Sequence, residues 1–152
     1  MRYYEDIVIG EMLTYGRYKI TREEIIDFAS RYDPQAFHLT DAAAQSGPFG
    51  TLAASGWMTA SVTMRMMVDH WRDTGMISKG GAGVEDLKWL RPVVPGDVLS
   101  LRQTFLEKRR SRSRPDLGLF RHRIETLDAD GIPVMTMIST GMTEVRDPSQ
   151  AE

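Results

Sequence analysis

Apolar and polar residues alternate with two different periods along this chain of 152 residues. Residues 11–20 alternate loosely, as a strand does, and Thr21 with Glu24 forms the capping-box pattern that opens a helix reaching about Tyr32. The helix is expected to end where Asp33 precedes a proline, because a residue before proline is pushed out of the α region. The pattern therefore predicts a strand followed by a short helix.

The longest predicted helix runs from Leu52 to about Trp71, after a short helical turn over residues 41–45 and a Ser-Gly-Pro-Phe-Gly loop. It is apolar on most of its sides, which leaves only a thin polar strip. Its apolar positions are Leu52, Ala53, Ala54, Trp57, Met58, Ala60, Val62, Met64, Met67 and Val68. A helix with this pattern is typical of a buried element, and we expect a sheet to wrap it.

Four strand-length runs with period-two stretches follow this helix. They cover residues 84–93, 98–109, 117–129 and 134–145. Residues 95–97 (Pro-Gly-Asp) and 128–131 (Asp-Ala-Asp-Gly) form turns between them. The order of elements predicts an α+β fold in which a long central helix lies in the concave face of a curved antiparallel sheet. We place this single domain over residues 1–146 and a polar tail over residues 147–152.

Composition and charge narrow the possible functions. The chain is 41% hydrophobic and 26% charged with a net charge of -2, which excludes an acidic or basic tail as its main feature and does not imply a bulk affinity for nucleic acid. It has no cysteine, so disulfides, thiolate metal sites and cysteine nucleophiles are excluded. His70 and His122 have no partner ligands at metal spacing, so we expect no metal site. The charged segment 1–6 lacks the apolar run of a signal peptide, and no stretch offers the roughly 20 apolar residues of a membrane span, so a cytoplasmic location is the default expectation.

The candidate chemistry lies between residues 33 and 56. Asp33 and His38 stand five positions apart, in front of Gly56 and the apolar helix. A carboxylate and an imidazole at this spacing can hold and activate a water molecule. The helix supplies unpaired backbone N–H groups and the positive end of its dipole, where a carbonyl oxygen can gather charge. The pattern points to addition of water across a polarised double bond.

Two segments of the chain resemble the MaoC-like dehydratases, a family that includes the (R)-specific enoyl-CoA hydratases. The first is residues 32–61, which contain the acid/base pair and the glycine. The second is residues 83–97, which read Gly-Val-Glu-Asp-Leu-Lys-Trp-Leu-Arg-Pro-Val-Val-Pro-Gly-Asp. The resemblance implies a hotdog fold and a dimer whose sheets join edge to edge. It also implies a thioester substrate on coenzyme A or an acyl carrier protein, with coenzyme A as part of the substrate and no separate cofactor.

The resemblance also assigns roles to residues. The family's catalytic Asp falls on Asp33, its His on His38, and its oxyanion-hole glycine on Gly56. By this resemblance Asp33 acts as general base on a water that His38 helps to hold, and the hydroxyl adds to C3 of a 2-enoyl thioester. The Gly56 N–H stabilises the enolate-like oxygen of the thioester. We also assign Ser55 and Trp57, which flank this glycine, to substrate binding.

A strong run of positive charge occupies residues 108–114, between two predicted strands. Blocks of like charge usually face water, so one interpretation is a solvated hairpin loop. A second is a clamp for the phosphates of coenzyme A, because arginine forks match phosphate oxygens. The arginines of this second interpretation are Arg109, Arg110, Arg112 and Arg114. A third is a role in nucleic-acid binding, which is disfavoured because no aromatic residue interleaves the run.

Three classes of function fit these features. A hydratase of enoyl thioesters is favoured because both Asp33 and His38 are present. A hotdog thioesterase would need a carboxylate placed to act at the carbonyl carbon, which the spacing does not require. The third class is a non-catalytic partner subunit that binds acyl thioesters. In each case a small sheet curled round one helix leaves an edge strand unpaired, which predicts a homodimer or a dimer of dimers.

Overall fold

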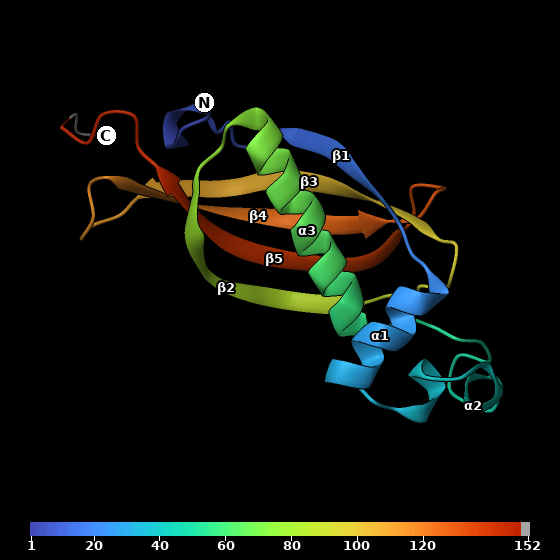
Figure 1. Cartoon of the computed structure of the whole chain (residues 1–152). Helices are drawn as coiled ribbons and strands as arrows, with labels where there is room; N and C mark the ends of the chain where they lie inside the picture. The colour runs from blue at the N-terminus through green and yellow to red at the C-terminus, as the bar shows by residue number, and fades with distance from the viewer. Residues whose placement is uncertain (150–152) are drawn as a thin grey trace.

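One curved sheet wrapped around one long helix forms the body of the molecule (Figure 1). Within the residues that the structure describes, five antiparallel strands form the sheet in the order β1-β3-β4-β5-β2. Their bounds are β1 Met12–Lys19, β2 Ser78–Trp89, β3 Val98–Arg110, β4 Leu117–Leu127 and β5 Pro133–Glu144. The helices are α1 Arg22–Tyr32, α2 Asp41–Gln45 and α3 Gly56–Thr74, with 3-10 turns at Tyr4–Asp6 and Ala36–His38. This arrangement confirms the predicted α+β fold.

The structure is a computed structural model that describes residues 1–149. The predicted polar tail covers residues 147–152, and its last three residues, 150–152, lie outside the described range. The domain boundary at residue 146 stays a prediction. Over residues 1–149 no helix combines the length and the apolar character that crossing a membrane requires.

Local sequence explains how β1 leads into α1. The Glu24 N–H donates to the Thr21 hydroxyl and the Thr21 N–H donates to the Glu24 carboxylate, each at 3.2 Å, so the predicted capping box is present. The helix ends at Tyr32, and Asp33 before the proline leaves the α region, as predicted. The short helix is thus defined at both ends by side chains close in sequence.

The core fills the space between α3 and the concave face of the sheet (Figure 1). The α3 side chains at its centre are Met58, Val62, Met66 and Met67. The sheet meets them with Leu99, Leu101, Ile124, Met135 and Met137. Burying one such side chain stabilises a fold by about 1.5–3 kcal/mol, so this layer fixes α3 along its length. The packing therefore also fixes where the N-terminal end of α3 lies.

α3 begins at Gly56, so the predicted start at Leu52 is wrong. Residues 52–55 are buried but not helical, and they pair with another segment: the Ala54 N–H donates to the Val93 carbonyl at 2.8 Å. An apolar, alanine-containing stretch suits a helix as well as a buried extended segment, so its pattern does not separate the two. The later start places the free N-terminal N–H groups of the helix at Gly56.

β2 begins earlier than predicted, at Ser78 rather than Val84. Residues 78–83 read Ser-Lys-Gly-Gly-Ala-Gly and have no apolar alternation, yet they pair with β5. Register shifts interrupt this pairing, as the glycines permit. β2 is an edge strand whose side chains are almost all exposed, and β1 forms the opposite edge.

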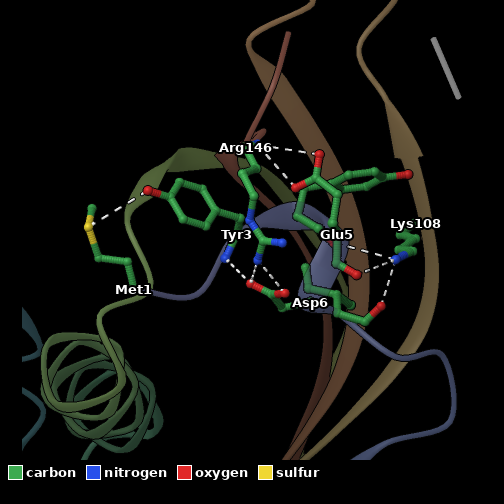
Figure 2. A network of polar contacts seen from close by, with 8 residues as sticks. Met1, Tyr3, Glu5, Asp6, Lys108 and Arg146 are labelled. Carbon is green, nitrogen blue, oxygen red and sulfur yellow. Dashed lines mark hydrogen bonds and ion pairs between the residues drawn. The ribbon is translucent and has the colours of Figure 1, made fainter. Parts of the chain in front are cut away.

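The N-terminal turn and the segment after β5 are held together beside β3 (Figure 2). The Arg146 guanidinium donates to both oxygens of the Asp6 carboxylate, at 2.6 and 2.7 Å. Lys108 on β3 donates to the carbonyls of Tyr4 and Ile7 at 3.4 and 2.7 Å, and its ammonium lies 4.9 Å from the centre of the Tyr4 ring. These contacts stand at the end of the sheet away from α1 and α2 (Figure 1).

Candidate active site

The end of α1 and the 3-10 turn after it bring Asp33 and His38 together. Asp33 is the C-cap of α1, where its N–H donates to the Ala29 carbonyl at 2.9 Å, and His38 closes the turn that follows. The chain folds back between them, so that His38 Nε2 lies 3.4 Å from Asp33 Oδ2. The side chains of Asp33 and His38 are 18% and 5% exposed, so the pair is recessed yet remains open to a small molecule.

Ala53 determines which nitrogen of His38 carries a proton. Nδ1 lies 2.6 Å from the Ala53 carbonyl oxygen, and because a carbonyl only accepts, Nδ1 is the donor. In the neutral imidazole Nε2 then presents a lone pair to the Asp33 carboxylate, which is also an acceptor. Two acceptors 3.4 Å apart suit a group that donates to both of them, such as a water molecule.

Hydrogen-bond donors keep Asp33 charged. The hydrogen bond from the Ser55 hydroxyl is the main reason that the pKa of Asp33 lies below its usual value; burial opposes this shift, while the hydrogen bond from Gln35 adds to it. Gln35 Nε2 donates to Asp33 Oδ1 at 2.7 Å. Ser55 is fully buried and is also the N-cap of α3, where its Oγ accepts the Trp57 N–H at 3.3 Å. One serine thus connects the carboxylate to the start of α3.

Gly56 is the first residue of α3 and lies directly after this cap. The Trp57 N–H donates to Ser55 Oγ, and the Met58 N–H donates to the Ser55 carbonyl at 2.9 Å. In the described part of the chain this leaves the Gly56 N–H as the donor of the first turn without a partner, at the positive end of the helix dipole. A backbone N–H so placed can stabilise a developing oxyanion.

Trp89 gives a further reason for a glycine at position 56. The indole of Trp89, the last residue of β2, packs against Gly56, and a Cβ there would lie 2.4 Å from Trp89 Cε2. Trp89 Nε1 donates to the Gly56 carbonyl at 2.8 Å, and its ring meets Trp57 edge-on with centroids 5.1 Å apart. The missing side chain at Gly56 therefore makes room for the indole.

A pocket of about 400 Å³ brings together all of the predicted site residues except the arginines. They are Asp33, His38, Ser55, Gly56 and Trp57. Aromatic side chains of Phe37, Phe49 and Trp89 and the segment Leu90–Val93 complete much of the lining. A mostly apolar pocket with a few convergent polar groups is typical of a site for a small molecule.

The four predicted arginines lie elsewhere in the chain. They are Arg109 and Arg110 at the end of β3, and Arg112 and Arg114 in the loop that leads to β4. This loop stands at the end of the sheet away from α1 and α2 (Figure 1). Arg114 donates to both oxygens of Asp116 at 2.9 and 2.7 Å, and Arg110 donates to the Asp147 carbonyl at 3.0 Å. Within one chain the arginines do not line the pocket, and the phosphate clamp stays a prediction.

Sequence reasoning did not identify several of the pocket residues, among them Trp89 and Arg91. Both lie in residues 83–97, the second segment that carries the family resemblance, so a signal for them was present. Nothing in the spacing of the chain links this segment to Asp33, because the link is made by sheet pairing. Among residues 1–149 no group of three or more His, Asp or Glu side chains is placed to hold a metal ion.

Comparison with known proteins finds relatives over most of the chain. A family model described as MaoC like domain matches residues 7–119. The crystal structure of a MaoC-like dehydratase from Rhodospirillum rubrum has a TM-score of 0.86 and 36% sequence identity, covering 97% of this chain and 99% of that chain. Protein YdeM of Bacillus subtilis (strain 168) is 24% identical over 133 residues, which are 86% of this chain and 90% of that protein. HadBC, a 3R-hydroxyacyl-ACP dehydratase complex from Mycobacterium tuberculosis, shares the fold at 19% identity, with a TM-score of 0.68 over 90% of this chain and 97% of that chain.

Proposed function

The chain belongs to the family of MaoC-like dehydratases, with the hotdog fold that the resemblance implied, and on that premise we propose that it adds water reversibly to a 2-enoyl thioester. The product is a 3-hydroxyacyl thioester, and the reverse reaction is a dehydration. The acyl group is carried on coenzyme A or on an acyl carrier protein. The name of one protein of the same fold, a 3R-hydroxyacyl-ACP dehydratase, supports a substrate of this class.

The geometry of Asp33 and His38 is the observation that carries this proposal. A water held between Asp33 Oδ2 and His38 Nε2 gives a proton to the carboxylate, while its oxygen bonds to C3 of the substrate. The π electrons of the C2–C3 double bond move toward the thioester carbonyl, and the proton is then delivered to C2. One O–H bond and the C2–C3 π bond are broken, and one C–O and one C–H bond are formed, so the bonds and atoms of water and substrate balance.

The N-terminal end of α3 completes the proposed site. The Gly56 N–H donates to the thioester oxygen as negative charge develops there, and the helix dipole adds to the stabilisation. Removing a single oxyanion donor typically lowers kcat by about 10²- to 10³-fold, so this contribution is comparable to that of an acid/base group. The apolar side chain of Trp57 lines the same pocket.

We further propose that the protein is a homodimer or a dimer of dimers. The exposed edge strand β2 supports this assembly, because natural proteins usually cover or pair such an edge. Its last residue, Trp89, lines the pocket, so a subunit boundary along β2 passes close to the active site.

Substitutions at Asp33 and His38 test the proposed reaction. Asp33→Asn keeps the shape of the side chain but removes the base, and His38→Ala removes the second group that holds the water. In an assay of crotonyl-CoA hydration, each should lower kcat by about 10²- to 10⁴-fold. The double variant should be little worse than the poorer single variant, since the two groups act as one unit. Asp41→Asn, at an exposed carboxylate that pairs with Arg22, is the matched control and should stay active.

The outcomes separate the three function classes. Hydration that survives in both single variants would rule out this pair as the site. Hydrolysis of saturated acyl-CoA by the parent, without hydration of enoyl-CoA, would identify a thioesterase. A parent chain that binds acyl thioesters but turns none over would be the non-catalytic partner subunit.

A further inference from the structure

Arg91 brings a positive charge into the lining of the pocket that contains Asp33 and His38. Among residues 1–149 it is the one Lys or Arg side chain in that lining. The segment 108–114, where the sequence suggested a phosphate clamp, lies at the other end of the sheet. Arg91 is therefore the cation that a substrate in this pocket would meet.

Backbone hydrogen bonds hold the segment around Arg91 on both sides. The N–H groups of Leu90 and Arg91 donate to the Val134 carbonyl at 2.8 and 3.3 Å. The Val93 carbonyl accepts the Ala54 N–H at 2.8 Å, directly before the cap of α3. The backbone of Arg91 is thus tied both to β5 and to the segment that leads to the oxyanion donor, so its position relative to the acid/base pair is set by the fold.

Asp128 orients the Arg91 guanidinium but does not engage all of its N–H donors. Arg91 Nη1 lies 3.5 Å from Asp128 Oδ2, and Asp128 Oδ1 accepts the N–H groups of Asp130 and Ile132 at 2.9 Å each. A contact at 3.5 Å engages one of the guanidinium nitrogens, while the group has five N–H donors. The Arg91 side chain is 52% exposed, which leaves donors accessible to a ligand.

Charge complementarity identifies the kind of ligand. The charge that faces the pocket from Asp33 is negative and repels an anionic group, so an anionic substrate needs a cation elsewhere in the lining. The planar fork of arginine matches carboxylate and phosphate oxygens. We infer that Arg91 binds an anionic oxygen group of the thioester substrate, either a carboxylate on the acyl group or a phosphate of the carrier. This inference rests on the proposed function, since it takes the substrate to be an acyl thioester.

Binding of saturated thioesters tests the inference without requiring turnover. Three ligands separate the two sources of charge: butyryl-CoA has phosphates, the N-acetylcysteamine thioester of a dicarboxylic acid has a carboxylate, and butyryl-N-acetylcysteamine has neither. Calorimetry should show that Arg91→Gln raises the Kd of whichever charged ligand uses this site by about 10-fold or more, because a hydrogen bond to a charged group is lost. The Kd of the uncharged thioester should stay unchanged.

Arg72→Gln, at an exposed arginine that pairs with Asp69 near the end of α3, is the matched control and should change none of the three Kd values. An equal loss for all three ligands in Arg91→Gln would overturn the inference, because it would show a structural role. Unchanged binding of both charged ligands would overturn it as well, and so would a parent chain that binds none of the three. Binding that depends on Arg91 in a chain without hydratase activity would instead sink the proposed reaction and leave the anion site standing.

Discussion

Ser55 controls the charge of the proposed base at the scale of a single residue. Its hydroxyl donates to Asp33 and lowers the pKa of that carboxyl more than any other neighbour, while its Oγ accepts the Trp57 N–H. Asp33 must be ionised to accept a proton, so activity is present above its lowered pKa and is lost as pH falls through it. Ser55→Ala should raise the pKa and move the acidic limb of the kcat/KM profile to higher pH. Gln35→Ala removes a weaker donor and should move the limb in the same direction by less.

The N-cap role of Ser55 has to be separated from this effect. Loss of a serine cap typically costs about 1 kcal/mol of stability, so the profiles should be recorded well below the melting temperature of each variant. A structural role alone would lower activity equally at every pH. An acidic limb that stays in place in Ser55→Ala would contradict the assignment of Ser55 to the charge state of Asp33.

The contact between α3 and β2 makes a prediction at the scale of elements. Gly→Ala within a helix normally stabilises it by up to about 1 kcal/mol. At Gly56 the added Cβ would lie 2.4 Å from the Trp89 ring, so the steric clash should outweigh the gain in helix propensity. Gly56→Ala should therefore destabilise the protein by about 1–3 kcal/mol, as overpacked sites do, measured by urea unfolding. In a Trp89→Ala background the same change should be neutral or stabilising. An equal cost of Gly56→Ala in both backgrounds would show that the indole is not its cause.

Elements whose signals are local could be predicted from the sequence, and elements fixed by distant pairing could not. The Thr21 capping box and the alternation of β3, β4 and β5 lie within short windows of sequence, and the structure has them. The start of α3 depends on the pairing of Ala54 with Val93, and the start of β2 depends on β5. The same division holds for the candidate site. Asp33 and His38 are close in sequence, so the sequence could predict that they face each other. Trp89 reaches the pocket only through the pairing of the sheet.

A buried polar chain under α3 links three strands at the scale of the whole molecule. The Tyr15 hydroxyl on β1 donates to Gln103 Oε1 on β3 at 2.6 Å, and Gln103 Nε2 lies 2.9 Å from His122 Nδ1 on β4. Burial lowers the pKa of His122 from 6.5 to about 4. The unfolded chain takes up this proton near pH 6.5 and the folded chain only near pH 4. Stability is therefore complete above pH 6.5 and is lost as pH falls from 6.5 to 4, by up to about 3 kcal/mol.

Urea unfolding at about pH 7 and about pH 5 checks this dependence. The free energy of unfolding of the parent should fall between the two conditions. His122→Gln keeps an acceptor for Gln103 but does not titrate, so its free energy should fall by less. Other ionisable groups titrate in both proteins, so the difference between the falls in unfolding free energy of the parent and of His122→Gln isolates the contribution of His122. An equal fall in the two proteins would contradict the prediction.

The two edges of the sheet make a last prediction, about assembly. β1 and β2 both end the sheet, and each exposes a large apolar side chain, Met12 at 61% and Val84 at 54%. β2 lies beside the pocket, and the nearby α3 also exposes Trp57. If two copies pair along β2, Val84→Glu places like charges at the boundary and should lower the molar mass measured by light scattering toward that of the monomer. Met12→Glu makes the same change at the other edge and should leave the dimer intact. Dissociation by Met12→Glu alone would show that the copies pair along β1 instead. A parent chain that is monomeric and fully active at micromolar concentration would contradict the proposed assembly.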